Sequence, residues 1–354
     1  MPLTPLIGHE KVRTRLAGAL ASGKLPQALL LVGPRGVGKQ RLALWLSQLI
    51  HCERPKSEPQ EPCGECRPCR LVVSLQHPDV HWFVPLELNK RGGGGAGGGI
   101  DADKQVELAA DALAEEMTAR REQPLYEPPA GLASHPVAAV RLLLRRLAMT
   151  PAIGTRKVFI VGDAERLIPQ LGTEVAANAL LKALEEPPAD SVIILTAADP
   201  NALLPTVLSR VVLVRVARIA DSDVTAFAQQ RLGITNKDEL AQRVTAAEGC
   251  IGKLLAISPV RSAPGGAEPA DRFLEAPWLF ALGQVPFQAR GGFTDMLDGL
   301  ASRLRSEVKQ GGDTEKLVEA IARVLDARDL AQGNVNPQLL AAVLAEDLQA
   351  MRRS

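Results

Sequence analysis

Aromatic side chains are scarce in this chain, and their scarcity limits the kind of core that it can build. Only 3% of its 354 residues are Phe, Trp or Tyr, whereas 46% are hydrophobic. The core must therefore consist mainly of Leu, Val, Ile and Ala side chains. This composition favours helices and α/β layers over an aromatic-rich β-sandwich. The length predicts two or three domains.

Strong net charge and long apolar runs are missing as well. The formal net charge is +1, which argues against a strongly basic nucleic-acid coat but does not exclude local basic patches. No segment approaches the ~18 apolar residues that span a bilayer. The first residues lack the basic and apolar regions of a secretory signal. We therefore expect a cytoplasmic protein without a membrane partner.

Cysteine is also rare, and four of the five cysteines are grouped. Cys52, Cys63, Cys66 and Cys69 follow the spacing C-x10-C-x2-C-x2-C. In a reducing compartment such a group indicates metal or thiol chemistry rather than disulfides, and four thiolates can complete a tetrahedral zinc shell. Free loop thiols and a redox C-x-x-C pair are the alternatives. We predict a structural zinc site, and we expect the separate Cys250 to be a small buried residue.

A glycine-rich segment, "LLLVGPRGVGKQRLALWL" at 29–46, is typical of a phosphate-binding loop. Gly33, Gly36, Gly38 and Lys39 match G-x-x-x-x-G-K, between an expected strand at 28–32 and a helix that continues to about 51. In such loops, backbone N–H groups and the lysine bind phosphate oxygens. The alternative is a glycine-rich turn without a ligand.

Two residues that hydrolysis requires are absent from this motif. Gln40 stands where a Ser or Thr hydroxyl would hold Mg²⁺. The strand expected at 157–162 ends in Gly162-Asp163, where an active ATPase of this type carries Asp-Glu, and Asp163 and Glu165 are expected to form a solvated turn. Because Mg²⁺ needs both the hydroxyl and the carboxylate, we expect no intrinsic ATPase activity. The sequence leaves open whether ATP or ADP binds inertly, without productive Mg²⁺.

The rest of the chain alternates apolar strands with helices as far as about 217, which predicts a mostly parallel sheet. Further strands are expected at 80–84, 191–197 and 211–216, and further helices at 8–23, 137–149 and 173–186. Residues 87–135 interrupt the pattern with "GGGGAGGG" and an amphipathic helix at 101–123. We expect them to form a mobile, peripheral insertion; a partner-binding arm is the alternative. Helical patterns follow at 221–257 and 272–354, separated by a Pro/Gly-rich linker at 258–271.

Several motifs in combination resemble the bacterial replicative clamp loaders, which are ATPases of the AAA+ class. They are "CGECRPC" (63–69), "NALLKALEEPP" (178–188), "LPTVLSRV" (204–211) and "NVNPQLLAAVL" (334–344). The resemblance implies an AAA+ α/β domain at 1–217 with a zinc module at 52–69. It also implies a small helical lid domain at 218–258 and a helical collar domain for oligomerisation at 272–354.

The resemblance also assigns a role to Arg210. In these proteins the segment Leu-Ser-Arg-Cys carries an arginine finger; Arg210 matches it, and Val211 replaces the cysteine. Such a finger stabilises charge on a phosphoryl group that is held by a neighbouring subunit. The residues alone leave two alternatives, a cap on a helix C-terminus and a surface ion pair.

Some subunits of this family hydrolyse ATP and others do not. Further departures from the motifs of the ATP-hydrolysing subunits indicate which kind this chain resembles. Ala197 and Ala198 replace a hydroxyl sensor, and Gly252 replaces the sensor arginine in "GCIGK" (249–253). The resemblance therefore implies a stator-like subunit in a hetero-pentamer with gamma/tau motor subunits and a delta subunit. Such a complex loads the sliding clamp onto primer-template DNA.

Two other functions stay open at this stage. One is a catalytically active gamma/tau-type ATPase with an unusual loop, and the other is a stand-alone zinc protein that binds nucleic acid. A basic helix face at Arg141, Arg145 and Arg146 fits contact with DNA phosphates. A solvated basic face explains these three arginines equally well.

Overall fold

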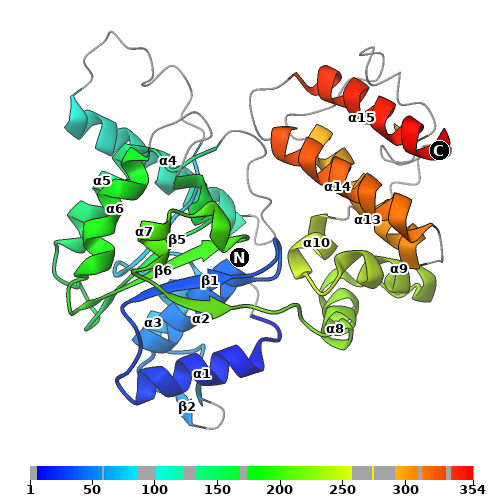
Figure 1. The fold of residues 1–354 in the computed structure, drawn as a ribbon. Coiled ribbons are helices and arrows are strands. Elements are labelled where there is room, and N and C mark those ends of the chain that lie inside the picture. The colour runs from blue at the N-terminus through cyan, green and yellow to red at the C-terminus, as the bar shows by residue number, and fades with distance from the viewer. Residues whose placement is uncertain are drawn as a thin grey trace. The chain divides into compact units, whose positions relative to one another are not determined.

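The computed structural model of the chain describes residues 6–57, 60–86, 101–122, 133–167, 174–256, 273–274, 292–309, 313–331 and 336–353. These residues belong to two compact units, which are described separately. The first contains the described residues as far as 256, and the second contains those from 273 onward. Figure 1 shows the elements of both units.

A five-stranded sheet forms the centre of the first unit, in the order β4-β5-β6-β1-β7. All neighbouring strands are parallel, and β1 pairs with β6 so that Val32 lies opposite Ala197. The predicted parallel sheet is therefore confirmed, and the bounds of each strand agree with the predicted ones to within about one residue. The strands are β1 (Ala28–Val32), β4 (Val80–Phe83), β5 (Lys157–Val161), β6 (Ser191–Ala197) and β7 (Val212–Arg215).

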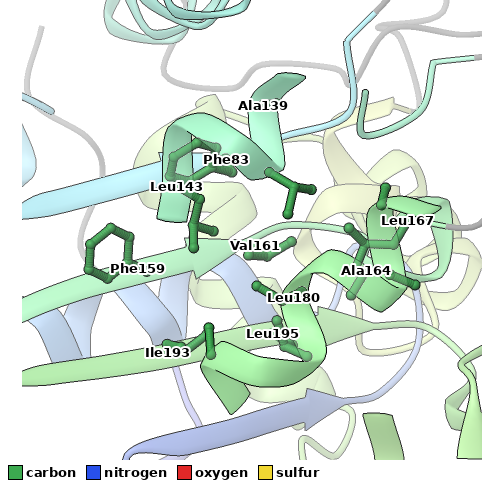
Figure 2. Packing of buried hydrophobic residues seen from close by; sticks show 14 of the residues in the cluster. Phe83, Ala139, Leu143, Phe159, Val161, Ala164, Leu167, Leu180, Ile193 and Leu195 are labelled. Atoms are coloured by element: carbon green, nitrogen blue, oxygen red, sulfur yellow. The ribbon is translucent and has the colours of Figure 1, made fainter. Parts of the chain in front are cut away.

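Helices cover both faces of this sheet because its strands are apolar on both sides. Along β1, Leu29 and Leu31 join one core cluster, whereas Leu30 and Val32 join the other. The first cluster includes residues of α1 (Glu10–Ala21), α2 (Lys39–His51) and α3 (Arg67–Val73). The second includes residues of α4 (Ala102–Glu122), α5 (Val137–Leu147) and α6 (Val175–Glu185). Figure 2 shows part of this cluster, with Leu143 of α5 and Leu180 of α6 among the labelled residues.

The predicted insertion contains the helix α4, and this helix is part of the core. Its side chains Val106, Ala109 and Leu113 are buried, on the face that the sequence periodicity predicts. They belong to the same cluster as Phe159 of β5. The expectation of a peripheral insertion is therefore wrong for α4, because its apolar stripe packs against α5. Residues 87–100 and 123–132, which the same prediction covered, lie outside the described residues.

Short elements connect these layers. They are the hairpin β2 (Lys56–Ser57) and β3 (Gln60–Glu61), the 3₁₀ turns η1 (Ala164–Leu167) and η2 (Pro200–Ala202), and α7 (Pro205–Leu208). Three helices complete the first unit: α8 (Asp221–Leu232), α9 (Lys237–Ala247) and α10 (Ile251–Ala256). They share a small core of their own around Val224, Ala247 and Leu254. This core explains the helical pattern at 221–257; its role as a lid stays a prediction.

The second unit contains α13 (Gly292–Lys309), α14 (Thr314–Ala331) and α15 (Pro337–Arg353). Leu297, Leu300 and Leu304 of α13 are buried in one cluster with residues of α14 and α15, within the helical pattern that the sequence predicts at 272–354. The role of these helices as a collar, and the division of the chain into three domains, stay predictions. The predicted linker at 258–271 lies outside the described residues. Across the described part of the chain, every helix is too short or too polar to cross a membrane.

Candidate functional site

The glycine-rich loop lies at the carboxyl end of β1, where parallel α/β sheets bind their ligands. Gly36 (φ 76°) and Gly38 (φ 105°) adopt left-handed backbone angles that favour glycine. Lys39 begins α2 and folds back over the loop, where its Nζ donates to the carbonyls of Gly33 (2.7 Å) and Pro34 (2.9 Å). Burial lowers the pKa of Lys39, and the nearby carboxylates of Asp163 and Glu165 oppose this shift. The predicted loop geometry is therefore present, with its lysine engaged by the loop itself.

Gln40 and Gly162, two of the departures that the sequence revealed, pack against each other. A Cβ atom at position 162 would lie 2.8 Å from Nε2 and 2.9 Å from Cδ of Gln40. The glutamine amide therefore occupies the space that any side chain at the end of β5 would need. A carboxylate at 162, as hydrolysis requires, fits only if Gln40 moves.

Gly252, a third departure, lies directly on the phosphate loop. Its N–H donates to the carbonyl of Gly36 at 2.8 Å, and a Cβ atom at 252 would lie 2.5 Å from the Cα atom of Gly36. The first turn of α10 thus contacts the loop backbone to backbone. This arrangement excludes an arginine at 252. The adjacent Lys253 forms an ion pair with Glu248 at 2.7 Å.

The remaining departures, Ala197 and Ala198, complete the same region at the end of β6. The N–H of Ala198 donates to Oε1 of Glu165 at 3.2 Å, and the carbonyl of Ala197 accepts from Gly33 at 3.3 Å. Burial is the main cause that raises the pKa of the Glu165 carboxyl, and the negative charge of Asp163 raises it further. The expectation of a solvated turn is therefore wrong for Glu165, which is half-buried. The structure brings all five degenerate positions around one loop.

Sequence reasoning missed two polar residues at this loop. The Thr196 hydroxyl, buried in β6, accepts a hydrogen bond from the N–H of Asp163 at 3.0 Å. The His9 ring lies 2.9 Å (Nε2) from the carbonyl of Val37. The threonine was detectable as the one hydroxyl within the apolar run "VIILTA". Nothing in the sequence around His9 indicated its contact with a loop 28 residues later.

Arg210 lies after α7 and contacts α6 and α7. Its Nε donates to Oε1 of Glu185 at 2.7 Å, and its Nη2 donates to the same oxygen. Its Nη1 donates to the carbonyl of Thr206 (2.7 Å) and to the Ser209 hydroxyl (3.2 Å). In this chain, Arg210 therefore makes both alternative contacts that the sequence left open, a helix cap and a surface ion pair.

The four grouped cysteines converge on one point between α2 and α3. Their Sγ atoms all lie within 4.8 Å of one another, and those of Cys63 and Cys69 are 3.9 Å apart. Four thiolates around one zinc ion, at about 2.3 Å each, would be about 3.8 Å apart. The N–H groups of Cys66 (3.3 Å) and Glu65 (3.4 Å) donate to Sγ of Cys63. These residues fit a tetrahedral metal ion.

The environments of the thiols differ. Hydrogen bonds from the backbone at Cys66 and Glu65 lower the pKa of Cys63 to about 6, whereas burial raises the pKa of Cys52 and of Cys69. A metal ion would therefore have to displace protons from the buried thiols. Cys250 lies apart from this group and is buried, as expected.

A carboxylate in the hairpin connects the cysteine cluster to the sheet domain. Glu61 of β3 accepts a hydrogen bond from Nε1 of Trp45 in α2 at 2.7 Å and forms an ion pair with Arg13 of α1. The Arg13 guanidinium also lies 5.5 Å from the centre of the Trp45 ring. The hairpin is thus held against two helices of the first core cluster.

Two arginines on the basic face of α5 make contacts within the chain. Arg145 forms an ion pair with Asp103 of α4. Nη1 of Arg146 lies 3.5 Å from Nδ1 of His81, and its guanidinium lies 6.0 Å from the centre of the Phe83 ring. Two of the three arginines considered for DNA contact are therefore engaged by α4 and β4.

Comparison with known proteins identifies the family. The sequence pattern of the family described as "DNA polymerase III, delta subunit" matches residues 8–220. DNA polymerase III subunit delta' of Pseudomonas aeruginosa is 33% identical over 52% of this chain and 41% of its own length. Subunit tau of Salmonella typhimurium is 25% identical over 98% of this chain and 46% of its own length. A solved gamma subunit-related protein of Thermotoga maritima has a TM-score of 0.42 and 19% identity over 97% of this chain and 99% of that chain.

The chain belongs to this DNA polymerase III family and is a delta-prime-like member of the clamp-loader proteins. Its matches span less than half the length of these curated relatives, 41% and 46%.

Proposed function

We propose that the chain is the δ′ subunit of a DNA polymerase III clamp loader, and that its own nucleotide site does not hydrolyse ATP. The contact between Gln40 and Gly162 carries this proposal, since it fills the space where a metal-binding carboxylate would stand. The backbone contact between Gly36 and Gly252 supports it. A carboxylate at 162 could bind Mg²⁺ only after the Gln40 side chain had moved.

In this role the chain supplies Arg210 to the ATP site of an adjacent gamma/tau motor subunit. It assembles with the motors and a delta subunit into a hetero-pentamer in the cytoplasm, and the assembly loads the sliding clamp onto primed DNA. The exposed apolar side chains Leu339 and Val343 of α15, and Val318 of α14, support assembly through the C-terminal helices. The chain then belongs to a DNA-directed DNA polymerase holoenzyme without being a nucleotidyltransferase itself.

Zinc is the metal that suits the four cysteines best. The Sγ separations match its preferred geometry, and all four positions of the shell are protein thiolates. A closed shell of this kind leaves no position for water or substrate, so the role is structural.

The arginine-finger role is tested in a reconstituted complex with motor subunits. Arg210→Ala is expected to lower the DNA-stimulated ATPase rate by about 10³-fold at the site that it faces, without loss of assembly. Because the other sites of the complex keep their own fingers, a single-site readout such as pre-steady-state hydrolysis is needed. Arg215→Ala, at an exposed arginine on the adjacent β7, is the matched control. An unchanged rate in an intact Arg210→Ala complex would refute the role.

A motor-type ATPase is the second candidate, because the tau relative aligns with 98% of this chain. Hydrolysis by the chain alone, abolished by Lys39→Ala, would support it. A stand-alone zinc protein, the third possibility, predicts tight and salt-dependent DNA binding without partner subunits.

A further inference from the structure

The Arg210 side chain is held by its own subunit through all three guanidinium nitrogens. Nε and Nη2 donate to Oε1 of Glu185, and Nη1 donates to the Thr206 carbonyl and the Ser209 hydroxyl. A guanidinium recognises a phosphate group through paired N–H donors of the same kind. The carboxylate of Glu185 therefore occupies the edge of Arg210 that a phosphate group would bind.

Glu185 is fixed in place by the core beneath it. It is the last residue of α6, and the preceding Ala183 and Leu184 are buried in the second core cluster. The backbone of Arg210 is fixed as well, because its N–H donates to the carbonyl of Val207 at 3.1 Å. The two side chains thus meet between rigid anchors, so a rotation of the Arg210 side chain is enough to separate them.

The contact is weak enough to be exchanged. The side chains of Arg210 and Glu185 are 28% and 46% exposed, and exposed ion pairs contribute little because water screens them. A phosphate group carries more negative charge than one carboxylate. Binding of a nucleotide phosphate at a subunit interface can therefore displace Glu185 from Arg210.

We infer that Glu185 is a positioning residue: it holds Arg210 on its own subunit until a nucleotide phosphate of the neighbouring subunit takes its place. This inference rests on the proposed finger role. Glu185 then competes with the phosphate for the guanidinium and sets how readily the neighbouring site becomes complete.

Glu185→Gln removes the charge of the holding residue while keeping its shape. In the reconstituted complex, it is expected to lower the KM for ATP at the site that Arg210 faces by roughly two- to fivefold, with kcat at that site unchanged, because the competing contact is weaker. The same single-site readout is used. Glu186→Gln, at the neighbouring exposed carboxylate, is the matched control and is expected to change neither value. In an Arg210→Ala background, Glu185→Gln is expected to have no effect. A fall in kcat, or an unchanged KM, would overturn the inference.

A second measurement on the full chain separates this inference from the finger role. Phenylglyoxal modifies accessible guanidinium groups, and peptide mass spectrometry gives the rate at each arginine. Glu185→Gln is expected to increase the rate at Arg210 roughly two- to fivefold because the competing contact is weaker, and Glu186→Gln to leave it unchanged. Equal rates at Arg210 in the parent chain and in Glu185→Gln would show that Glu185 does not hold it. If Glu185→Gln raises this rate but Arg210→Ala leaves the ATPase rate at the site that it faces unchanged, the finger role fails and the holding contact stands.

Discussion

Single residues at the phosphate loop differ from those of an ATPase in a coordinated way. Gln40 is longer than the hydroxyl side chain that it replaces, and Gly162 provides the space for its amide. Gly252 provides the space for the backbone of Gly36 in the same manner. An arginine at 252 would clash with the backbone of Gly36, so we expect that reversion to destabilise the loop, whereas a carboxylate at 162 requires only that the Gln40 side chain move.

A buried histidine beside this site makes stability depend on pH. The ring of His135 lies 2.7 Å (Nε2) from the carbonyl of Gly162, and burial lowers its pKa to about 4. The ring is therefore neutral in the folded chain, whereas the unfolded chain takes up a proton below pH 6.5. Because the unfolded state binds more protons there, the stability present above this pH is lost as the pH falls toward the folded pKa.

Between about pH 7 and pH 5, we expect His135 to account for a loss of about 2 kcal/mol in the free energy of unfolding. Because His51 and His81 also have pKa values lowered to about 4, the difference in urea unfolding between the parent chain and a His135 variant measures this loss. His135→Gln, which keeps a donor for the Gly162 carbonyl but cannot titrate, is expected to reduce the slope with pH by nearly one proton. A slope identical to that of the parent chain would show that His135 is not the group responsible.

Among the elements, the β2–β3 hairpin and α3 have little core of their own. At the two ends of this segment, the Sγ atoms of Cys52 and Cys69 lie within 4.8 Å of each other. Glu61 provides the main polar contact with α1 and α2. Metal coordination is therefore expected to be necessary for its order.

Loss of the metal ion tests the dependence of this segment on coordination. We expect elemental analysis to find one zinc ion per parent chain and none in Cys66→Ser, and we expect Cys66→Ser to lower the melting temperature by roughly 5 °C or more. Cys250→Ala, which changes a buried cysteine outside the cluster, is expected to retain the zinc. A parent chain that purifies from zinc-containing medium without metal would contradict the assignment.

At the scale of the whole first unit, the contact between Gly36 and Gly252 joins α10 to the phosphate loop of the sheet domain. Nucleotide binding normally requires space above this loop for the phosphates. We expect this contact to hold α10 and the sheet domain in one fixed arrangement. Such rigidity fits the stator-like role that is proposed for this subunit.

Thermal unfolding with Mg-ATP tests this idea on the full chain. A ligand at about one hundred times its Kd would stabilise the chain by about 2.7 kcal/mol. With millimolar Mg-ATP we expect no shift in melting temperature and no phosphate release, with identical results for Lys39→Ala. A saturable shift that Lys39→Ala removes would show that the loop opens and binds nucleotide, and turnover would favour the motor-type alternative.

Local patterns in the sequence are enough to predict the parallel sheet, the loop after β1 and the cysteine group. The sheet follows from apolar runs of strand length, the loop from its G-x-x-x-x-G-K motif between a strand and a helix, and the cysteine group from its spacing. The resemblance to the clamp loaders singled out the departures at 40, 162, 197, 198 and 252, and their functional meaning stays a prediction.

Folding in three dimensions settled how those positions relate to one another. It brought Gln40 against Gly162 and Gly252 against Gly36, packed α4 into the core, and placed Glu185 on Arg210. Glu185 and Arg210 are 25 positions apart along the chain, and Gly36 and Gly252 are much farther apart. Local pattern carries no information about such pairs, because they form only when the crossovers of the sheet bring distant loops to the same edge.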